Sequence, residues 1–331
     1  MAANVKNLFI INPRSFWKAG KMDRIITGIQ NYFKDSGAGD YDIVISQFPR
    51  DAIGIIRYHK EKIPEEITLR VYAVGGDGIL FDCLNGIMGL SNVELGAMPY
   101  GRTNNFIRGF GKKNEYLFRD LSLLCKADTV PLDVIYTGNN YALEHCILGT
   151  EADAVRQSIV IREKTEKSGS INRWLSRFLY ILFYFIGGVS ACLNKKLQCQ
   201  HYKITVDGEP FEGLFQAINI ANGYFYGGIM HPMNEALPND GILDILITQS
   251  RSMLHTYCIL PFYMTGNYKK VARDFIHKRG TKITIESDYP LVICLDDKIF
   301  FDTELNVELL PSAVKFIDPT KKGYLGALAN G

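Results

Sequence analysis

The stretch RVYAVGGDGILFDCLNG, residues 70–86, decides the fold. An apolar run at 71–74 ends at Gly75-Gly76-Asp77-Gly78, and a helix-like run at 79–85 follows at once. This order predicts a strand, a glycine turn and a helix. Three glycines around one carboxylate let the backbone turn tightly and approach a ligand, and the N–H groups of the new helix favour an anion, above all phosphate. A plain tight turn is the alternative.

The residues on either side repeat this order. Apolar runs at 4–11, 41–48 and 93–99 predict further strands, and helical spacing at 22–33 and 51–62 predicts helices between them. This alternation predicts an open, mostly parallel α/β sheet. Polar loops follow three strands, at 12–15 (NPRS), 75–78 (GGDG) and 100–105 (YGRTNN), so we expect them to meet at one sheet edge. The glycine loop matches neither a Walker A loop nor a dinucleotide fingerprint.

From about residue 127 the pattern changes to short strands separated by turns. They are expected at 129–136, 140–148, 203–207, 215–221, 242–248, 282–286 and 291–295, with a helical insert at about 152–193. We therefore predict an α/β domain over 1–128, a β-rich, sandwich-like domain over 129–318 whose last segment can return to the first domain, and a tail over 319–331. A cleft would separate the two domains.

The composition bears on nucleic-acid binding, on disulfides and zinc, and on the cellular compartment. The chain has 331 residues with 47% hydrophobic residues, enough for a sizeable core, and its net charge of +2 gives no electrostatic argument for nucleic acid. The seven cysteines are odd in number and lack a C-x-x-C pair, which favours free thiols over disulfides or zinc. With an N-terminus too short for a signal peptide, these features predict a cytoplasmic protein.

An uncharged stretch at 178–194, preceded by Arg173 and Arg177, raises the question of membrane contact. It is shorter than the roughly 20 apolar residues of a spanning helix, and Gly187-Gly188 weaken it as a helix. Two interpretations remain. It is a buried helix of the second domain, or a surface helix that contacts a bilayer or a lipid chain.

Several motifs occur together in a fixed order. They are Asn12-Pro13, Gly75–Gly78 with Asn85-Gly86, Pro99-Tyr100-Gly101 with Asn104, Phe106 and Arg108, Ala221-Asn222 with Gly227-Gly228, and Pro238–Gly241 with Leu243-Asp244. Over about residues 5–318 the chain thereby resembles the diacylglycerol kinase catalytic-domain family, which includes bacterial soluble lipid kinases and sphingosine kinases. The resemblance implies an NAD-kinase-like fold, ATP in the cleft, Mg²⁺, and transfer of the γ-phosphoryl group to a lipid hydroxyl. It also implies a possible homodimer.

The resemblance also implies roles for individual residues. The nucleotide would lie against Asn12, Pro13, Arg14, Ser15, Ser46, Gly75, Gly76, Gly78, Gly101, Arg102 and Asn104. Asp77 would orient the nucleophile or hold a Mg²⁺-bound water. Asn239, Asp240 and Asp244 match a segment that carries a metal in bacterial members, and their oxygens suit Mg²⁺ or Ca²⁺. A type I turn is the alternative for that segment.

Four positions depart from the family pattern. Ile79 and Arg102 each stand where threonine is usual, and Asn105 replaces a carboxylate. Lys298 stands where a glutamate general base is expected, which leaves Asp296 and Asp297 as candidate bases. Arg102 would either clamp a phosphate or block the site.

Three functions remain open: an active lipid kinase, a protein that binds nucleotide or lipid without turnover, and a kinase for a soluble acceptor such as a dinucleotide.

Overall fold

The computed structural model describes residues 5–16, 20–37, 39–167, 200–228, 230–296 and 298–324. The apolar stretch at 178–194, Asp297 and most of the predicted tail lie outside these residues. The same holds for the helical insert beyond residue 167. Within the described part of the chain, no helix is long and apolar enough to span a bilayer.

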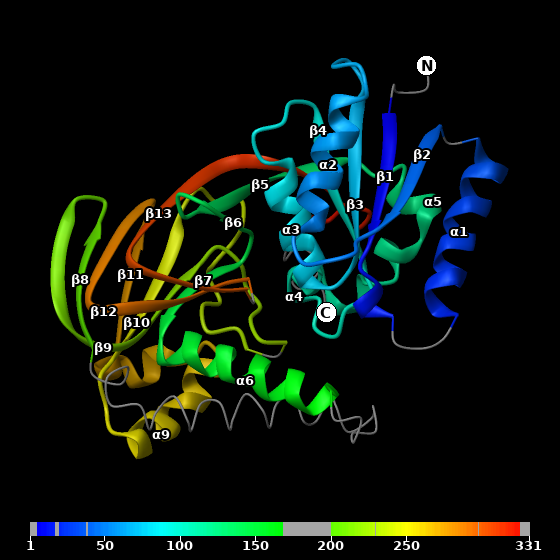
Figure 1. The fold of residues 1–331 in the computed structure, drawn as a ribbon. Helices are drawn as coiled ribbons and strands as arrows, with labels where there is room; N and C mark the ends of the chain where they lie inside the picture. The colour runs from blue at the N-terminus through cyan, green and yellow to red at the C-terminus, as the bar shows by residue number, and fades with distance from the viewer. Residues whose placement is uncertain are drawn as a thin grey trace.

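The N-terminal half is the predicted α/β unit. Strands β1 (Val5–Ile11), β2 (Asp40–Ile45), β3 (Thr68–Gly75) and β4 (Val93–Pro99) are parallel, in the order β4-β3-β1-β2. Helices α1 (Lys21–Ser36), α2 (Asp51–Glu61) and α3 (Asp77–Ile87) flank them, as Figure 1 shows. Shorter helices are η1 (Pro13–Ser15), α4 (Asn105–Arg108), η2 (Lys112–Asn114), η3 (Leu117–Arg119) and α5 (Leu121–Leu124). Strands β1, β3 and β4 are apolar and largely buried because helices cover the sheet, whereas the edge strand β2 is only partly buried.

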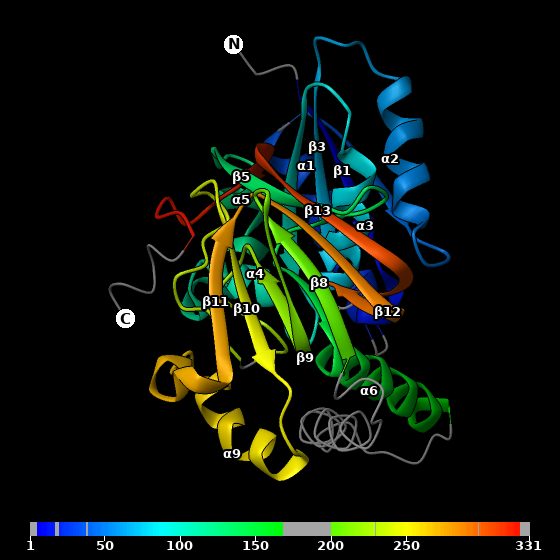
Figure 2. The ribbon, with the colours of Figure 1, turned by 90° about the vertical axis from the view of Figure 1, so that its left-hand side faces the viewer.

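The C-terminal half is the predicted β-rich unit. Its strands are β5 (Thr129–Tyr136), β6 (Tyr141–Ala142), β7 (His145–Gly149), β8 (Gln200–Val206), β9 (Glu209–Ala221), β10 (Leu243–Gln249), β11 (Phe275–Gly280), β12 (Lys282–Leu295) and β13 (Lys298–Ile317). They pair antiparallel, with the central order β11-β10-β9-β7-β12-β13. Helices α6 (Thr150–Lys167) and α9 (Met253–Met264) lie together at one end of these strands, and η4 (Tyr268–Asp274) follows α9 (Figures 1 and 2).

The last strand connects the two halves. β13 pairs antiparallel with β12 and β5, and Phe316 pairs in parallel with Leu95 of β4. In Figure 1 this strand arches from the C-terminal strands to the N-terminal sheet. All thirteen described strands therefore belong to one continuous sheet, although the hydrophobic core divides into separate clusters.

Some predicted element boundaries are wrong. The strand expected at 140–148 is split into β6 and β7, and those expected at 282–286 and 291–295 form the single strand β12. The turn-like residues 287–290 sit at a register shift in β12, where pairing with β13 resumes beyond the irregularity. Strands β11 and β13 and helix α9 were not predicted. Helix α9 is apolar on all sides and contains Pro261, so it has no amphipathic period to detect.

Candidate active site

The three polar loops lie together, as the sequence predicts. The Asn12 amide donates to the Val74 carbonyl at 3.1 Å, which joins the first loop to the end of β3. The amides of Tyr100 and Gly101 both donate to the Gly75 carbonyl, at 2.7 and 2.9 Å. The carboxyl ends of β1, β3 and β4 therefore form one compact polar edge.

The glycines of this edge mainly allow the backbones of the three loops to pack closely. A methyl group on Gly75 would lie 2.9 Å from Ser15 Oγ, and one on Gly101 would lie 2.4 Å from the Gly76 Cα. None of these glycines has a positive φ. Close loop packing, rather than the conformational freedom of glycine, thus explains Gly75, Gly76 and Gly101. Gly78 differs, because the nearest atom to its missing methyl is the flexible Lys298 Nζ at 3.8 Å.

Helix α3 begins inside the glycine loop, at Asp77, with Gly76 as its N-cap. The helix N-terminus and its partial positive charge therefore point into the loop, as an anion site requires. The Asp77 side chain is buried, and Thr103 Oγ1 donates to its Oδ2 at 2.8 Å. Burial raises the pKa of Asp77, while the Thr103 hydroxyl and the amides of Asn105 and Phe106 offset part of that rise.

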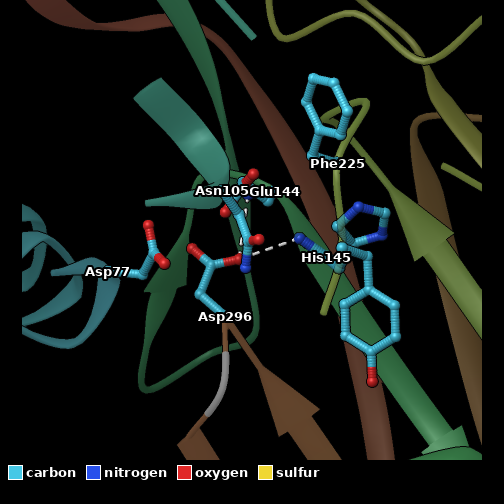
Figure 3. Close-up of a pocket in the computed structure, with 7 residues that line it drawn as sticks. Asp77, Asn105, Glu144, His145, Phe225 and Asp296 are labelled. Atoms are coloured by element: carbon cyan, nitrogen blue, oxygen red, sulfur yellow. Dashed lines mark hydrogen bonds between the residues drawn. The ribbon is translucent and has the colours of Figure 1, made fainter. Parts of the chain in front are cut away.

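A pocket opens beside Asp77, between the two halves of the molecule (Figure 3). The N-terminal half contributes Asp77 and Asn105, and the C-terminal half contributes Glu144, His145, Phe225, Tyr226 and Asp296. Asn105 Oδ1 accepts a hydrogen bond from the Gly228 amide at 2.8 Å. The Asn105 side chain thus joins the two halves at the pocket wall.

Asp296 lies in the turn between β12 and β13, with a left-handed φ of 41°. Its carboxylate accepts the amides of Leu143, Glu144 and His145 at 2.6–3.0 Å, and Figure 3 shows the bond from His145. Burial raises the pKa of Asp296 to about 6, although the hydrogen bonds from these amides lower it. The nearby Asp77 charge adds to the rise. Asp296 therefore holds the start of β7 in place.

Lys298 does not line this pocket. Its ammonium lies beside Gly78 and 3.5 Å from Oδ1 of the buried Asp82. The other oxygen of Asp82 accepts the Arg50 amide at 3.2 Å. Lys298 thus pairs with a buried carboxylate of α3.

A buried polar chain extends away from the pocket. His145 Nδ1 is 2.9 Å from Asn219 Oδ1, Asn219 Nδ2 donates to Tyr263 Oη at 2.8 Å, and Tyr263 Oη contacts both carboxylate oxygens of Glu151. Burial lowers the pKa of His145 to about 4 and raises that of Glu151 to about 7. The imidazole is therefore neutral at neutral pH.

Sequence reasoning missed four lining residues, namely Glu144, His145, Phe225 and Tyr226. Two polar residues inside the apolar stretch ALEHCIL, at 142–148, were the available signal for Glu144 and His145. No local pattern separates Phe225 and Tyr226 from core aromatics.

The other predicted nucleotide residues lie in the loops that follow β1, β2 and β4. Asn12, Pro13 and Ser15 are partly exposed and Arg14 is exposed, while the Ser46 hydroxyl is buried and donates to the Ile11 carbonyl at 3.2 Å. Asn104 caps α4 with a φ of 49°, and Arg102 is exposed at the surface. Ile79 is 2% exposed and packs in the N-terminal core.

Two of the three predicted metal residues, Asp240 and Asp244, contact basic side chains of the protein. Arg279 Nη2 is 2.8 Å from Asp240 Oδ2, and Arg279 Nε is 3.2 Å from Asp244 Oδ1. His277 Nε2 is 2.7 Å from the same Asp244 oxygen, and Asn239 is exposed. Among the described residues, no group of three or more His, Cys, Asp or Glu side chains is arranged to hold a metal ion.

Comparison with known proteins identifies both halves of the chain. Residues 6–137 match the diacylglycerol kinase catalytic domain, and residues 171–318 match the YegS C-terminal NAD kinase beta sandwich-like domain. Two proteins of Staphylococcus aureus, from strains JH9 and Newman and both named "Putative lipid kinase", are each 24% identical over 248 residues, which is 75% of this chain and 76% of each relative.

Solved structures share the fold. A crystal structure titled as a putative diacylglycerol kinase from Bacillus anthracis strain Sterne superposes with a TM-score of 0.69 at 23% identity, covering 94% of both chains. A second structure from that organism has a TM-score of 0.67 at 22% identity, covering 94% of this chain and 96% of its own.

Proposed function

Because the chain belongs to the diacylglycerol kinase catalytic-domain family, we propose that it is an ATP-dependent lipid kinase. The acceptor is the hydroxyl of a diacylglycerol-like or other long-chain lipid. The observation that carries the proposal is the position of Asp77. Its buried carboxylate sits at the N-terminus of α3, in a pocket walled by both halves of the molecule. The names of the relatives support a lipid as the acceptor.

The polar edge supplies what phosphoryl transfer needs, which is positioning and compensation of charge. In the proposal, the ATP phosphates lie at the α3 N-terminus beside Gly78, and Asn12–Ser15, Ser46 and Gly101–Asn104 surround the nucleotide. Mg²⁺ bound to ATP would neutralise part of the negative charge of the phosphates. Because no metal group is built by the described residues, the proposal assigns this ion to the nucleotide.

Asp77 acts on the acceptor in this scheme. The lipid hydroxyl donates a hydrogen bond to the Asp77 carboxylate, and its oxygen forms a bond to the γ-phosphorus. The bond from that phosphorus to the β–γ bridging oxygen breaks, ADP leaves, and the hydroxyl proton passes to Asp77. Burial makes Asp77 a stronger base than an exposed aspartate, and the Thr103 hydrogen bond fixes its orientation.

Asp296 has a positioning role in this proposal. Its oxygens already accept three backbone amides, which orient Glu144 and His145 toward the pocket wall. The predicted alternative base Asp297 lies outside the described residues. Phe225 and Tyr226 give the pocket an aromatic side, which suits the apolar part of a lipid.

One observation favours the second candidate, a protein that binds nucleotide or lipid without turnover. The ammonium of Lys298, for which the resemblance implies the position of the general base, pairs with Asp82 beside the glycine loop. A charged lysine cannot accept a proton. In this interpretation, the pocket still binds nucleotide or lipid but no longer catalyses phosphoryl transfer.

The deciding experiment measures Mg²⁺-dependent formation of phosphorylated lipid from radiolabelled ATP and diacylglycerol in mixed micelles. The wild type is compared with Asp77→Asn and with Asp35→Asn, which alters an exposed carboxylate on α1. We expect Asp77→Asn to lower the rate by about 100-fold or more, which is the usual contribution of a positioned base. The control variant should match the wild type.

Three other outcomes would change the assignment. Equal rates in Asp77→Asn and the wild type would remove Asp77 from the chemistry. An ATP-induced rise in melting temperature without product for any acceptor would establish the second candidate. Product formed only from a soluble acceptor such as a dinucleotide would exclude the lipid.

A further inference from the structure

The segment after Pro238 is held by basic side chains of the protein itself, the Arg279 guanidinium and the His277 ring. We propose that Arg279, assisted by His277, takes the place of the metal ion that the family resemblance assigns to Asn239, Asp240 and Asp244. This part of the fold is then independent of divalent cations. The inference does not rest on the proposed kinase activity.

The geometry around Arg279 is that of a cation shared by two carboxylates. Its Nη2 lies 2.8 Å from Asp240 Oδ2 and its Nε lies 3.2 Å from Asp244 Oδ1. The planar guanidinium, with several fixed donors, is suited to such a bridge. A divalent ion that used the same oxygens would have to displace a group already within hydrogen-bond distance.

Strand pairing sets this contact. Asp244 on β10 stands directly opposite Arg279 on β11, and His277 pairs with Leu246 two positions along. Arg279 and His277 therefore project from the same face of β11, and both reach Asp244 Oδ1. Directly opposed residues of an antiparallel pair have adjacent side chains, so strand pairing itself places the Arg279 guanidinium beside Asp244.

Burial explains why a compensating charge is needed. The Asp244 side chain has 0% exposure, and a buried carboxylate without a charged partner is strongly unfavourable. Protein groups also contact the backbone on either side of Asp240. The Gly241 amide donates to Asp133 Oδ2 at 2.8 Å, and the Asp133 amide donates to the Pro238 carbonyl at 2.6 Å. These two hydrogen bonds are made within the polypeptide, whereas the second oxygen of Asp244, Oδ2, is buried and has no hydrogen-bond partner among the described residues.

The test is thermal unfolding and calorimetric titration of the full chain without nucleotide. After treatment with EDTA, the wild type is titrated with MgCl₂ and, separately, with CaCl₂. We expect no change in melting temperature and no saturable heat. Arg279→Met should unfold at a lower temperature, and millimolar Mg²⁺ or Ca²⁺ should then raise its melting temperature, because a ligand that binds only the folded state stabilises it.

Controls make the test specific. Arg273→Met removes an exposed arginine of η4 and should leave the metal response absent. Arg279→Lys keeps a positive charge without the planar fork, so it should fold and respond to metal weakly or not at all. The proposal is overturned if either ion stabilises the EDTA-treated wild type and Asp240→Asn or Asp244→Asn abolishes that effect. It is also overturned if Arg279→Met folds and shows no response to either metal.

Discussion

Asp77 and Asp296 are two buried carboxylates that line one pocket, and their contacts give them different tasks. Asp77 has a side-chain partner in Thr103 and stands at a helix N-terminus, where a ligand anion would also bind. Asp296 is occupied by three backbone amides from one turn. Asp77 also accepts the backbone amides of Asn105 and Phe106, so the two carboxylates differ in the elements that they contact, and we propose that Asp77 meets the substrate while Asp296 supports the wall.

The raised pKa of Asp296 predicts a pH dependence of stability. Burial raises this pKa from 3.8 to about 6, so the folded state holds the proton more tightly than the unfolded state does. The contribution of Asp296 protonation to the free energy of unfolding is fully present below about pH 4 and is lost as the pH rises through about 6. Above that pH, the free energy of unfolding no longer changes with this group. Urea unfolding between pH 4 and 7 should show the wild type losing free energy of unfolding relative to Asp296→Asn. Parallel curves would contradict the shift.

The pair of Lys298 with Asp82 predicts an energetic coupling. Lys298→Met leaves the buried Asp82 carboxylate without its cation, so we expect a loss of about 1–3 kcal/mol in the free energy of unfolding. In Asp82→Asn the same lysine change should cost less, because the buried charge is already gone. A double-mutant cycle by urea unfolding measures the difference, and strictly additive effects would show that the two groups do not interact.

At the scale of elements, the β3–α3 unit derives its shape from contact between loops. The glycines at its turn are adjacent to Ser15 and to Gly101 of two other loops. Three segments that are distant in sequence therefore form this edge, and they can pack this closely only because the glycines have no side chain. A helix N-terminus that is held this firmly is a rigid place to receive phosphate groups.

Two glycine variants test this account. Gly101→Ala would bring a methyl to 2.4 Å from the Gly76 Cα, so overpacking should cost about 1–3 kcal/mol of stability. Gly78→Ala has room and a better helix former, so its stability should match or slightly exceed that of the wild type. Because its methyl faces the proposed phosphates, Gly78→Ala should show a smaller melting-temperature rise with Mg²⁺-ATP. Equal stability of the two variants would refute the packing explanation.

At the scale of the whole molecule, the pocket exists because both halves share one sheet. β13 carries Lys298 at its start and pairs with β4 of the N-terminal sheet near its end. The bond from the Gly228 amide to Asn105 closes the same junction on the pocket side. Relative motion of the halves would therefore alter the distance between Asp77 and the C-terminal wall.

Asn105→Ala tests the importance of this junction. The change removes a hydrogen bond between the two halves, and Asn114→Ala removes a local one, from Asn114 Nδ2 to the Phe110 carbonyl. Both should lower the free energy of unfolding by about 1 kcal/mol. Only Asn105→Ala should also reduce the rate of lipid phosphorylation, because it alone loosens the pocket wall. Equal rates in the two variants would show that this bond does not position the site.

The sequence by itself determined the α/β half, the β-rich half and the polar edge. These features depend on local signals, since apolar periodicity selects strand or helix and the end of each strand places its loop. Strand 93–99 and strand 129–136 have the predicted bounds. The family motifs added Asp77 and the expectation of a kinase.

Only the tertiary structure decided the pocket wall and the charge partners. Asp296 reaches amides more than 150 positions earlier in the chain, and β13 joins strands from both halves. Arg279 meets Asp244 through the register of β10 and β11, which no local pattern reveals. The physical reason is common to all three. A side chain's partner across a sheet or between domains depends on strand pairing and burial over the whole chain, whereas periodicity and turn chemistry extend over only a few residues.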